Sequence, residues 1–186
     1  MNCRLIKNIK HSCEYNPGGI KEIYLLDIRD FKTYLFRNDE LYENCFVDRI
    51  FKEDTEYINL DIVSESTFNE THENGIYKQQ LTTFVGTLSH EKTADLLLAK
   101  ANKYLIAFRT NQDNIYTFGS DGGASVNFTQ SSGQTGETSG YSITITKDSV
   151  FPLFEVDANK FNKLLVLGTE NNIIVSTEDY KYAILI

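Results

Sequence analysis

The sequence predicts a mainly β protein with a single convincing α-helix. Ile, Thr, Val, Phe and Tyr together supply 65 of the 186 residues, whereas Ala occurs only 7 times. β-branched and aromatic side chains fit the pleated, half-buried surface of a sheet, while Ala is the strongest helix former. Short runs of alternating apolar and polar residues, separated by clusters of Gly, Asn and Asp, give the second indication. We therefore expect most elements to be strands.

Strands are expected throughout the first half of the chain, after an irregular start that ends in the turn cluster Asn16-Pro17-Gly18-Gly19. The expected ranges are 20–27, 33–37, 41–50 and 55–63. In the last of these, the period-two pattern directs Ile58, Leu60 and Ile62 inward.

Residues 67–85 read as one long strand or as the two arms of a hairpin. Asn74-Gly75 lies in the middle of this segment. That dipeptide is typical of a tight hairpin turn, but the flanking residues are equally compatible with a β-bulge. Both alternatives remain open from the sequence.

The segment 89–101 predicts the helix. Ser89 is suited to the N-cap, and Glu91 favours the first turn, although Lys92 leaves the capping box incomplete. One apolar stripe follows helical spacing, and we expect it to lie on a sheet; it consists of Ala94, Leu97, Leu98 and Ala101.

Further strands follow the helix. Their expected ranges are 103–110, 115–118, 124–129 and 141–146. The second and third are joined by the glycine-rich link 119–123. In the last, Ile143 and Ile145 point to one side, and Ser142, Thr144 and Thr146 point to the other. Residues 131–140 hold three Gly and no apolar side chain, which predicts a mobile projecting loop. Beyond Phe154, short strands are expected at 164–167, 173–175 and 180–186.

The charge of the chain excludes one class of function. Asp and Glu number 26 against 18 Lys and Arg, a net charge of −8, so no basic face grips nucleic acid. The start of the chain lacks the apolar core of a signal peptide, and no run approaches the roughly 18 apolar residues of a membrane span. We expect a protein made in the cytosol, with three cysteines that form no disulfide framework.

No group of residues in the sequence predicts catalysis. Metal sites are conceivable at two places, but neither matches a known ligand spacing: Cys3, His11 and Cys13 for zinc, and Asp27, Asp30, Asp113 and Asp121 for calcium. His72 and His90 have no nucleophile nearby, and the glycine-rich link lacks the Lys and the following helix of a phosphate loop. We expect no enzyme, no cofactor and no metal.

The order of turns and strands in the second half of the chain resembles that of a known family. Phe118, Gly119, Asp121 and Gly122 form a turn, and a loop leads to a strand with Gly140, Tyr141, Ile143 and Thr144 and then to Pro152. This order, with Cys13 ahead of Gly18-Gly19-Ile20, resembles tail-tube-like structural proteins of tailed bacteriophages, particularly those of phages and prophages of gut Bacteroidetes. The resemblance covers about residues 13–155 and leaves the last thirty residues without a counterpart.

The resemblance implies a fold and a function. The fold is an antiparallel β-sandwich or half-barrel with one flanking helix, in a domain of residues 1–156 with an N-terminal arm, followed by a C-terminal β extension at 157–186. The implied function is non-enzymatic: copies assemble into a ring or tube in a tail tube, collar or tail ring that conducts the genome. The net charge of −8 on each copy would then give the ring an acidic lumen, through which DNA slides without sticking.

The implied partners are other copies of the chain, six or twelve in a ring, together with tail, collar or portal proteins. Double-stranded DNA would pass without specific binding, and no membrane is involved. The location is the virion, with assembly in the host cytoplasm. The residues expected at the contacts between copies are Asn69, Thr71, Asn74, Tyr77, Ser132, Gln134, Thr135, Glu137, Ile184, Leu185 and Ile186.

The alternative is a host-attachment or carbohydrate-binding β-sandwich on a fibre or capsid. Such a module would present aromatic side chains on an exposed face. The candidates are Tyr15, Tyr42, Tyr77 and Tyr116.

Overall fold

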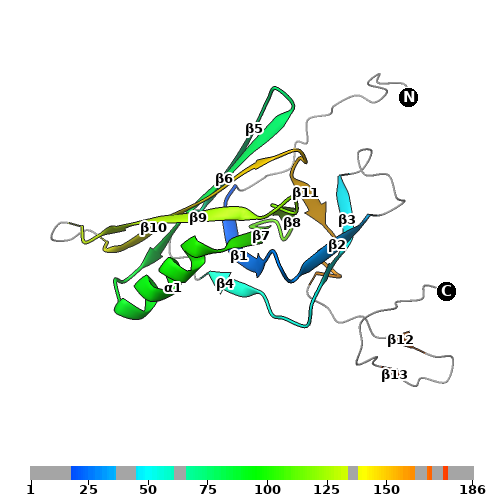
Figure 1. Ribbon diagram of the computed structural model, residues 1–186, viewed down its shortest axis with the longest axis horizontal. Coiled ribbons are helices and arrows are strands. Elements are labelled where there is room, and N and C mark those ends of the chain that lie inside the picture. Colours follow the sequence, from blue (N-terminus) through cyan, green and yellow to red (C-terminus); the bar gives the residue numbers. More distant parts are fainter. Residues whose placement is uncertain are drawn as a thin grey trace.

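Strands make up most of the described chain, and one helix accompanies them (Figure 1). The computed structural model describes residues 18–36, 45–60, 66–133 and 138–161, and the backbone of two short strands farther on. The strands of the main sheet are β1 (Ile20–Asp27), β2 (Phe31–Phe36), β3 (Phe46–Lys52), β4 (Ile58–Leu60), β5 (Thr67–Glu73), β6 (Ile76–Gly86), β7 (Lys103–Thr110), β8 (Ile115–Phe118), β9 (Ala124–Ser131), β10 (Gly140–Ser149) and β11 (Phe154–Val156). The helix is α1 (His90–Ala101), which is too short to cross a membrane.

The eleven strands form one open, mixed sheet that divides at β7 into two parts. The first, which we call the β7 half, has the order β4-β1-β7-β8-β11-β3-β2. The second, the β6 half, has the order β9-β10-β6-β5 and joins β7 through Lys103↔Ser125 and Tyr104↔Ala124. Neighbouring strands are antiparallel except β3 and β11, which run parallel. The mainly β fold with one helix, consistent with a β-sandwich or half-barrel, is thereby confirmed.

The main core lies between the two halves. Ile23, Ile106 and Phe118 of the β7 half face Leu81 and Ile143 of the β6 half, and all five side chains are buried. At the far side of this core, an isolated bridge joins Ile20 of β1 to Ser66 just ahead of β5. Because that bridge brings the outer strand of the β6 half back to β1, the two halves wrap around the core as a half-barrel.

A second core covers the opposite face of the β7 half. Ala107 and Ile115 are buried there beside Phe154 of β11. A turn after β11 adds Phe161, whose ring lies 5.1 Å from that of Tyr24. The β7 half is therefore covered on both faces, which explains why KYLIAFRT in β7 is almost continuously apolar.

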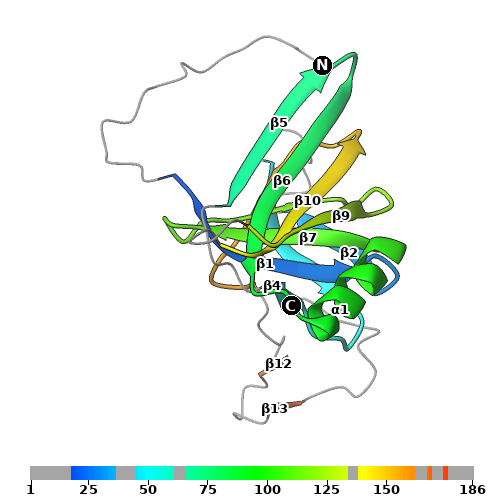
Figure 2. The same ribbon diagram turned by 90° about the vertical axis from the view of Figure 1, so that its left-hand side faces the viewer.

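Strands β5 and β6 form a hairpin that projects beyond the other described strands (Figure 2). Its turn is Asn74-Gly75, with φ angles of 53° and 80°, and Glu73 pairs with Ile76 across it. Two residues with positive φ between paired strands define the tight turn that Asn-Gly favours. The hairpin prediction is confirmed, and the bulge alternative is wrong.

The glycine-rich link 119–123 is a turn that moves the chain from the β7 half to the β6 half. Gly123 has a φ of +81°, and a Cβ atom there would lie 2.6 Å from Cβ of Lys103. Glycine is therefore required where β8 ends and β9 begins on the same edge of β7.

The helix lies where the sequence predicts it, but the predicted face is wrong. Ser89 is the N-cap and accepts a hydrogen bond of 3.2 Å from the amide of Lys92. Leu96 is the buried residue, whereas Leu97 and Leu98 are 57% and 65% exposed, and Ala94 and Ala101 are exposed as well.

The rotation of the helix is set by polar contacts at its first turn. The hydroxyl of Tyr141 donates to the carbonyl of Ser89 at 2.8 Å and lies 2.7 Å from Oγ1 of Thr93. Lys92 donates to the carbonyl of Gly86 at 2.8 Å. These bonds turn Thr93 and Leu96 toward the sheet, and the periodicity of apolar residues did not contain that information.

The inward direction predicted for Ile58 also differs from the structure. Ile58 is 56% exposed rather than inward, because β4 is a three-residue strand that pairs with β1 alone among the described strands. Tyr57 instead packs against Phe161 in the second core, Leu60 packs at the main core, and Ile62 lies outside the described residues.

Of the C-terminal extension, the structure describes β12 (Leu167–Gly168) and β13 (Ile174–Val175), which pair antiparallel. They fall at the ends of two expected strands. The division of the chain at residue 156 stays a prediction.

Candidate functional site

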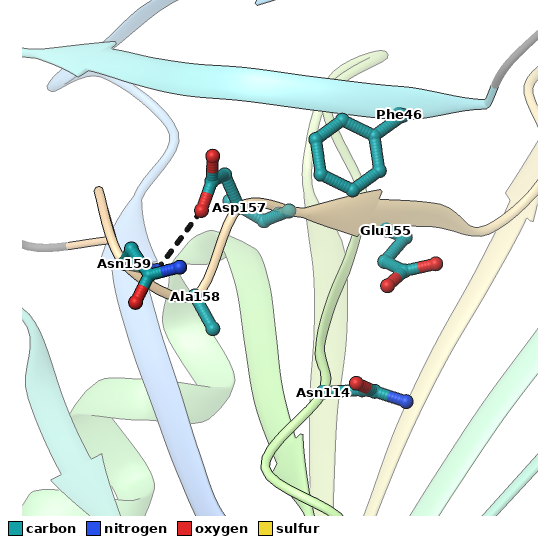
Figure 3. A pocket seen from close by; sticks show the side chains of 7 residues that line it. Phe46, Asn114, Glu155, Asp157, Ala158 and Asn159 are labelled. Carbon is teal, nitrogen blue, oxygen red and sulfur yellow. Dashed lines mark hydrogen bonds between the residues drawn. The ribbon is translucent and has the colours of Figure 1, made fainter.

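A hollow of about 320 Å³ lies beside β11 (Figure 3). Its lining includes Phe46, Asn114 and the carboxylates of Glu155 and Asp157. Asp157 accepts a hydrogen bond of 3.0 Å from the amide of Asn159, and so orders the turn after β11. Among the described residues, none that lines this hollow is a histidine, cysteine or lysine.

A second hollow, of about 260 Å³, lies by the glycine-rich link. Two lysines line it, and both donate hydrogen bonds to neighbouring residues. Lys147 donates to the carbonyl of Asp121 at 2.7 Å and lies 3.3 Å from its carboxylate. Lys103 donates to the hydroxyl of Ser125. The lysines therefore hold the turn and the junction between the halves.

The acidic residues considered for calcium lie in separate places. Asp27 pairs with Arg29 at 2.6 Å, Asp113 pairs with Lys21, and Asp121 pairs with Lys147. The hydrogen bond from Arg29 lowers the pKa of Asp27, and that from Lys21 lowers the pKa of Asp113. Within the described ranges, no three His, Cys, Asp or Glu side chains come together to hold a metal. Cys3, His11 and Cys13 lie outside those ranges.

Cys45 is partly buried, His72 contacts a tyrosine, and His90 is exposed. Burial, and then the nearby charge of Glu70, raise the pKa of the Cys45 thiol, which disfavours the reactive thiolate. His72 stacks on Tyr77 across the hairpin with ring centres 4.5 Å apart, and His90 is exposed at the start of α1.

A buried polar cluster ties the projecting hairpin to the body of the protein. The amide of Gln79, which is 2% exposed, donates to Oε2 of Glu70 at 2.8 Å. The same carboxylate oxygen accepts a bond of 2.9 Å from the backbone of Leu153. This cluster fixes β5 and β6 relative to the chain that enters β11, so the hairpin is a held extension of the sheet.

The feature that distinguishes the molecule is the outward face of the β6 half. Alternation along the four strands sends one set of side chains into the core and the other set away from it. Register aligns the outward set in rows across the sheet: Thr67, Thr82, Thr144 and Asn127 in one row, and Asn69, Gln80, Thr146 and Ser125 in the next. Over these two rows the face thus carries no charge and presents hydroxyl and amide groups.

The expected contact residues are distributed around this face. Asn69 and Thr71 belong to it, Asn74 is exposed in the hairpin turn, and Ser132 is exposed just after β9. Tyr77 points to the opposite side, where it stacks on His72. Six expected residues lie outside the described part of the chain: Gln134, Thr135, Glu137, Ile184, Leu185 and Ile186.

Sequence reasoning missed Gln80, Thr82, Asn127 and Thr144 as members of one surface. The alternation of Ser142, Thr144 and Thr146 was visible in the sequence, but the rows depend on strand register.

The tyrosines proposed for ligand binding do not form a common surface in the described residues. Tyr116 packs against Phe108, with ring centres 5.7 Å apart, whereas Tyr77 lies beside the turn of the hairpin and packs against His72. Tyr15 and Tyr42 lie outside the described ranges.

Comparison of the chain with protein-family models, with curated proteins and with solved structures gives no match.

Proposed function

We propose that this protein is a non-enzymatic structural protein of a tailed bacteriophage that assembles into a ring or tube, as a tail tube, collar or tail ring, and forms part of the conduit for genome ejection. The observation that supports the proposal most directly is the pair of unpaired edges on the β6 half. Among the described strands, β5 pairs with β6 alone once past the bridge of Ser66 to Ile20, and β9 beyond Ser125 pairs with β10 alone, with α1 beside it. Unpaired sheet edges are ready sites for pairing with another chain.

The strand directions suit a closed ring. Since each neighbouring pair in the order β9-β10-β6-β5 is antiparallel, β5 and β9 run in opposite directions. Rotation about an axis along the strands therefore brings β5 of one copy beside β9 of the next in antiparallel orientation. Head-to-tail contacts of this kind form a closed ring when the rotations between successive copies add up to a full turn.

The register of the β5-β6 hairpin determines which backbone N–H groups point outward and are available for such pairing. In a two-residue hairpin, the residues flanking the turn exchange hydrogen bonds, and bonded pairs then alternate along the strands. With Glu73 paired to Ile76, the outward N–H groups of β5 are those of Phe68, Glu70 and His72. The same alternation, carried across β10, leaves Val126, Phe128 and Gln130 outward on β9.

The proposed ring has a suitable size. Four strands from each of about six copies give a wall of about 24 strands, which at about 4.8 Å per strand is about 37 Å across before strand tilt widens it. Such a bore admits duplex DNA. Six or twelve copies, contacts with other tail, collar or portal proteins, and a place in the virion after assembly in the host cytoplasm all belong to this proposal.

An edge variant with a matched control tests the proposal. His72→Pro removes an outward N–H of β5 but none of the bonds expected between β5 and β6, whereas His72→Ala removes the side chain and keeps that N–H. We expect rings or tubes in negative-stain images of the wild type and of His72→Ala, and monomers for His72→Pro. A wild type that remains monomeric at high concentration contradicts the proposal.

A further inference from the structure

The outward face of the β6 half is free of charge over most of its area. Its uncharged polar members are Thr67, Asn69, Thr71, Gln80, Thr82, Ser125, Asn127, Thr129, Ser131, Ser142, Thr144 and Thr146. Its apolar members are Phe84, in the row of Ser142 and Thr129, and Ile76, which is 42% exposed beside the hairpin turn. The chain has 44 charged Lys, Arg, Asp and Glu side chains, yet few of them lie on this face.

Three charged side chains of this face lie together near the hairpin turn, where the ammonium group of Lys78 offsets one of two carboxylates. Glu73 pairs with Lys78 at 2.6 Å, and Asp148 is the cross-strand neighbour of Lys78. Glu73, and to a smaller extent Asp148, raise the pKa of Lys78, so its ammonium group faces two carboxylates. At the opposite strand, Lys103 reaches the hydroxyl of Ser125 from the junction with the β7 half.

The position of the rest of the subunit determines which side of the wall this face occupies. The opposite face of the β6 half is filled by the main core, behind which lie the β7 half and α1. If β5 and β9 join neighbouring copies, the β6 half is the wall of the ring. The β7 half and α1, which lie behind the wall, take up more circumference than the wall itself. They therefore lie on the outside of the ring, and the polar face lies on the inside.

A neutral polar face suits a duplex that must move. DNA carries a dense row of phosphates, and lysine or arginine on the wall would bind them through release of counterions. Carboxylates would repel the duplex, whereas hydroxyl and amide groups hold water and bind the phosphates only weakly.

We infer that the outward face of β9-β10-β6-β5 lines the bore and presents the DNA with uncharged hydroxyl and amide groups; this inference rests on the proposed function. It differs from the acidic lumen that the net charge led us to expect. Most carboxylates of the described residues, such as Glu22, Asp27, Asp113 and Glu155, lie instead on the β7 half and its turns.

Cysteine accessibility tests the placement of the face. In a background without the three native cysteines, Thr144→Cys marks the face, and Gln112→Cys marks the exposed turn between β7 and β8 as the matched control. In the assembly, we expect a small maleimide to label both sites and a maleimide carrying a bulky polyethylene glycol chain to lose its reaction with Thr144→Cys alone. In His72→Pro monomers, both reagents should label both sites.

The outcomes separate the inference from the proposed function. Rings in which the bulky reagent labels both cysteines equally overturn the inference and leave the proposed function intact. The absence of any assembly overturns both.

A charge variant tests the role of neutrality. Thr82→Lys with Thr144→Lys places two cations in one row of the face, and Gln112→Lys is the control. We expect the assembled double variant to bind a short DNA duplex with an affinity that falls steeply with salt, and the wild type and the control to show no such binding. Equal binding by wild type and double variant contradicts the inference.

Discussion

In the β7 half, both faces of the sheet lie against other side chains, whereas the β6 half buries one face and leaves the other bare of described neighbours. Residues of β7 such as Leu105, Ile106 and Ala107 are fully buried in succession. On β10, buried Ile143 and Ile145 alternate with Ser142 and Thr144 on the solvent side. The comparison indicates that buried side chains of both halves stabilise the subunit, while the β6 half leaves one face open among the described residues, the face that we propose for contact with DNA.

Replacement of neighbouring residues on β10 gives the largest expected contrast. Ile143 is fully buried between the halves, so Ile143→Ala should lower the free energy of unfolding by about 2–5 kcal/mol. Thr144→Ala on the outward face should change it by less than about 0.5 kcal/mol. Urea unfolding of the dilute, monomeric protein measures both. Similar costs for the two variants would mean that the outward face is also packed within the subunit.

The helix offers a contrast of intermediate size. Leu96→Ala should cost about 2 kcal/mol or more, because Leu96 is buried in the main core, whereas Leu98→Ala should be nearly neutral. Thermal unfolding followed by circular dichroism distinguishes them. A large cost for Leu98→Ala, without one for Leu96→Ala, would restore the face that the apolar periodicity predicted.

A smaller effect is expected at the polar rim of the β7 half. The hydroxyl of Tyr24 donates to Glu22 at 2.6 Å, and Nε of Arg109 does so at 2.7 Å; these bonds, led by that of Tyr24, lower the pKa of Glu22 against the effect of burial. A carboxyl whose pKa is lower when folded stabilises the protein above its unfolded pKa of about 4.3, and that stability is lost as the pH falls through the folded pKa.

Glu22→Gln should therefore flatten the decline in stability on acidification below about pH 5. Unfolding curves at a series of pH values, compared with those of the wild type, measure the difference. An unchanged acid slope would show that the Glu22 contacts do not contribute.

Local chemistry accounts for what the sequence could predict. Asn74-Gly75 encodes its turn within two residues, and Ser89 encodes the start of α1. Leu97 and Leu98 were assigned to the wrong face because the hydroxyl of Tyr141, 52 residues away, fixes the rotation of the helix. The polar face could not be predicted because Thr67, Thr82, Thr144 and Asn127 become neighbours only through the register of four strands.

Hydrogen exchange of the unpaired edges tests the central claim most directly. Amide exchange is compared between dilute protein and protein at the concentration of assembly. We predict that the amides of Phe68, Glu70 and His72 on β5, and of Val126, Phe128 and Gln130 on β9, gain protection together in the assembly, while those of β2 and β4 do not. Protection that appears at β2 or β4 instead, or no concentration-dependent protection on β5 and β9, would contradict the account.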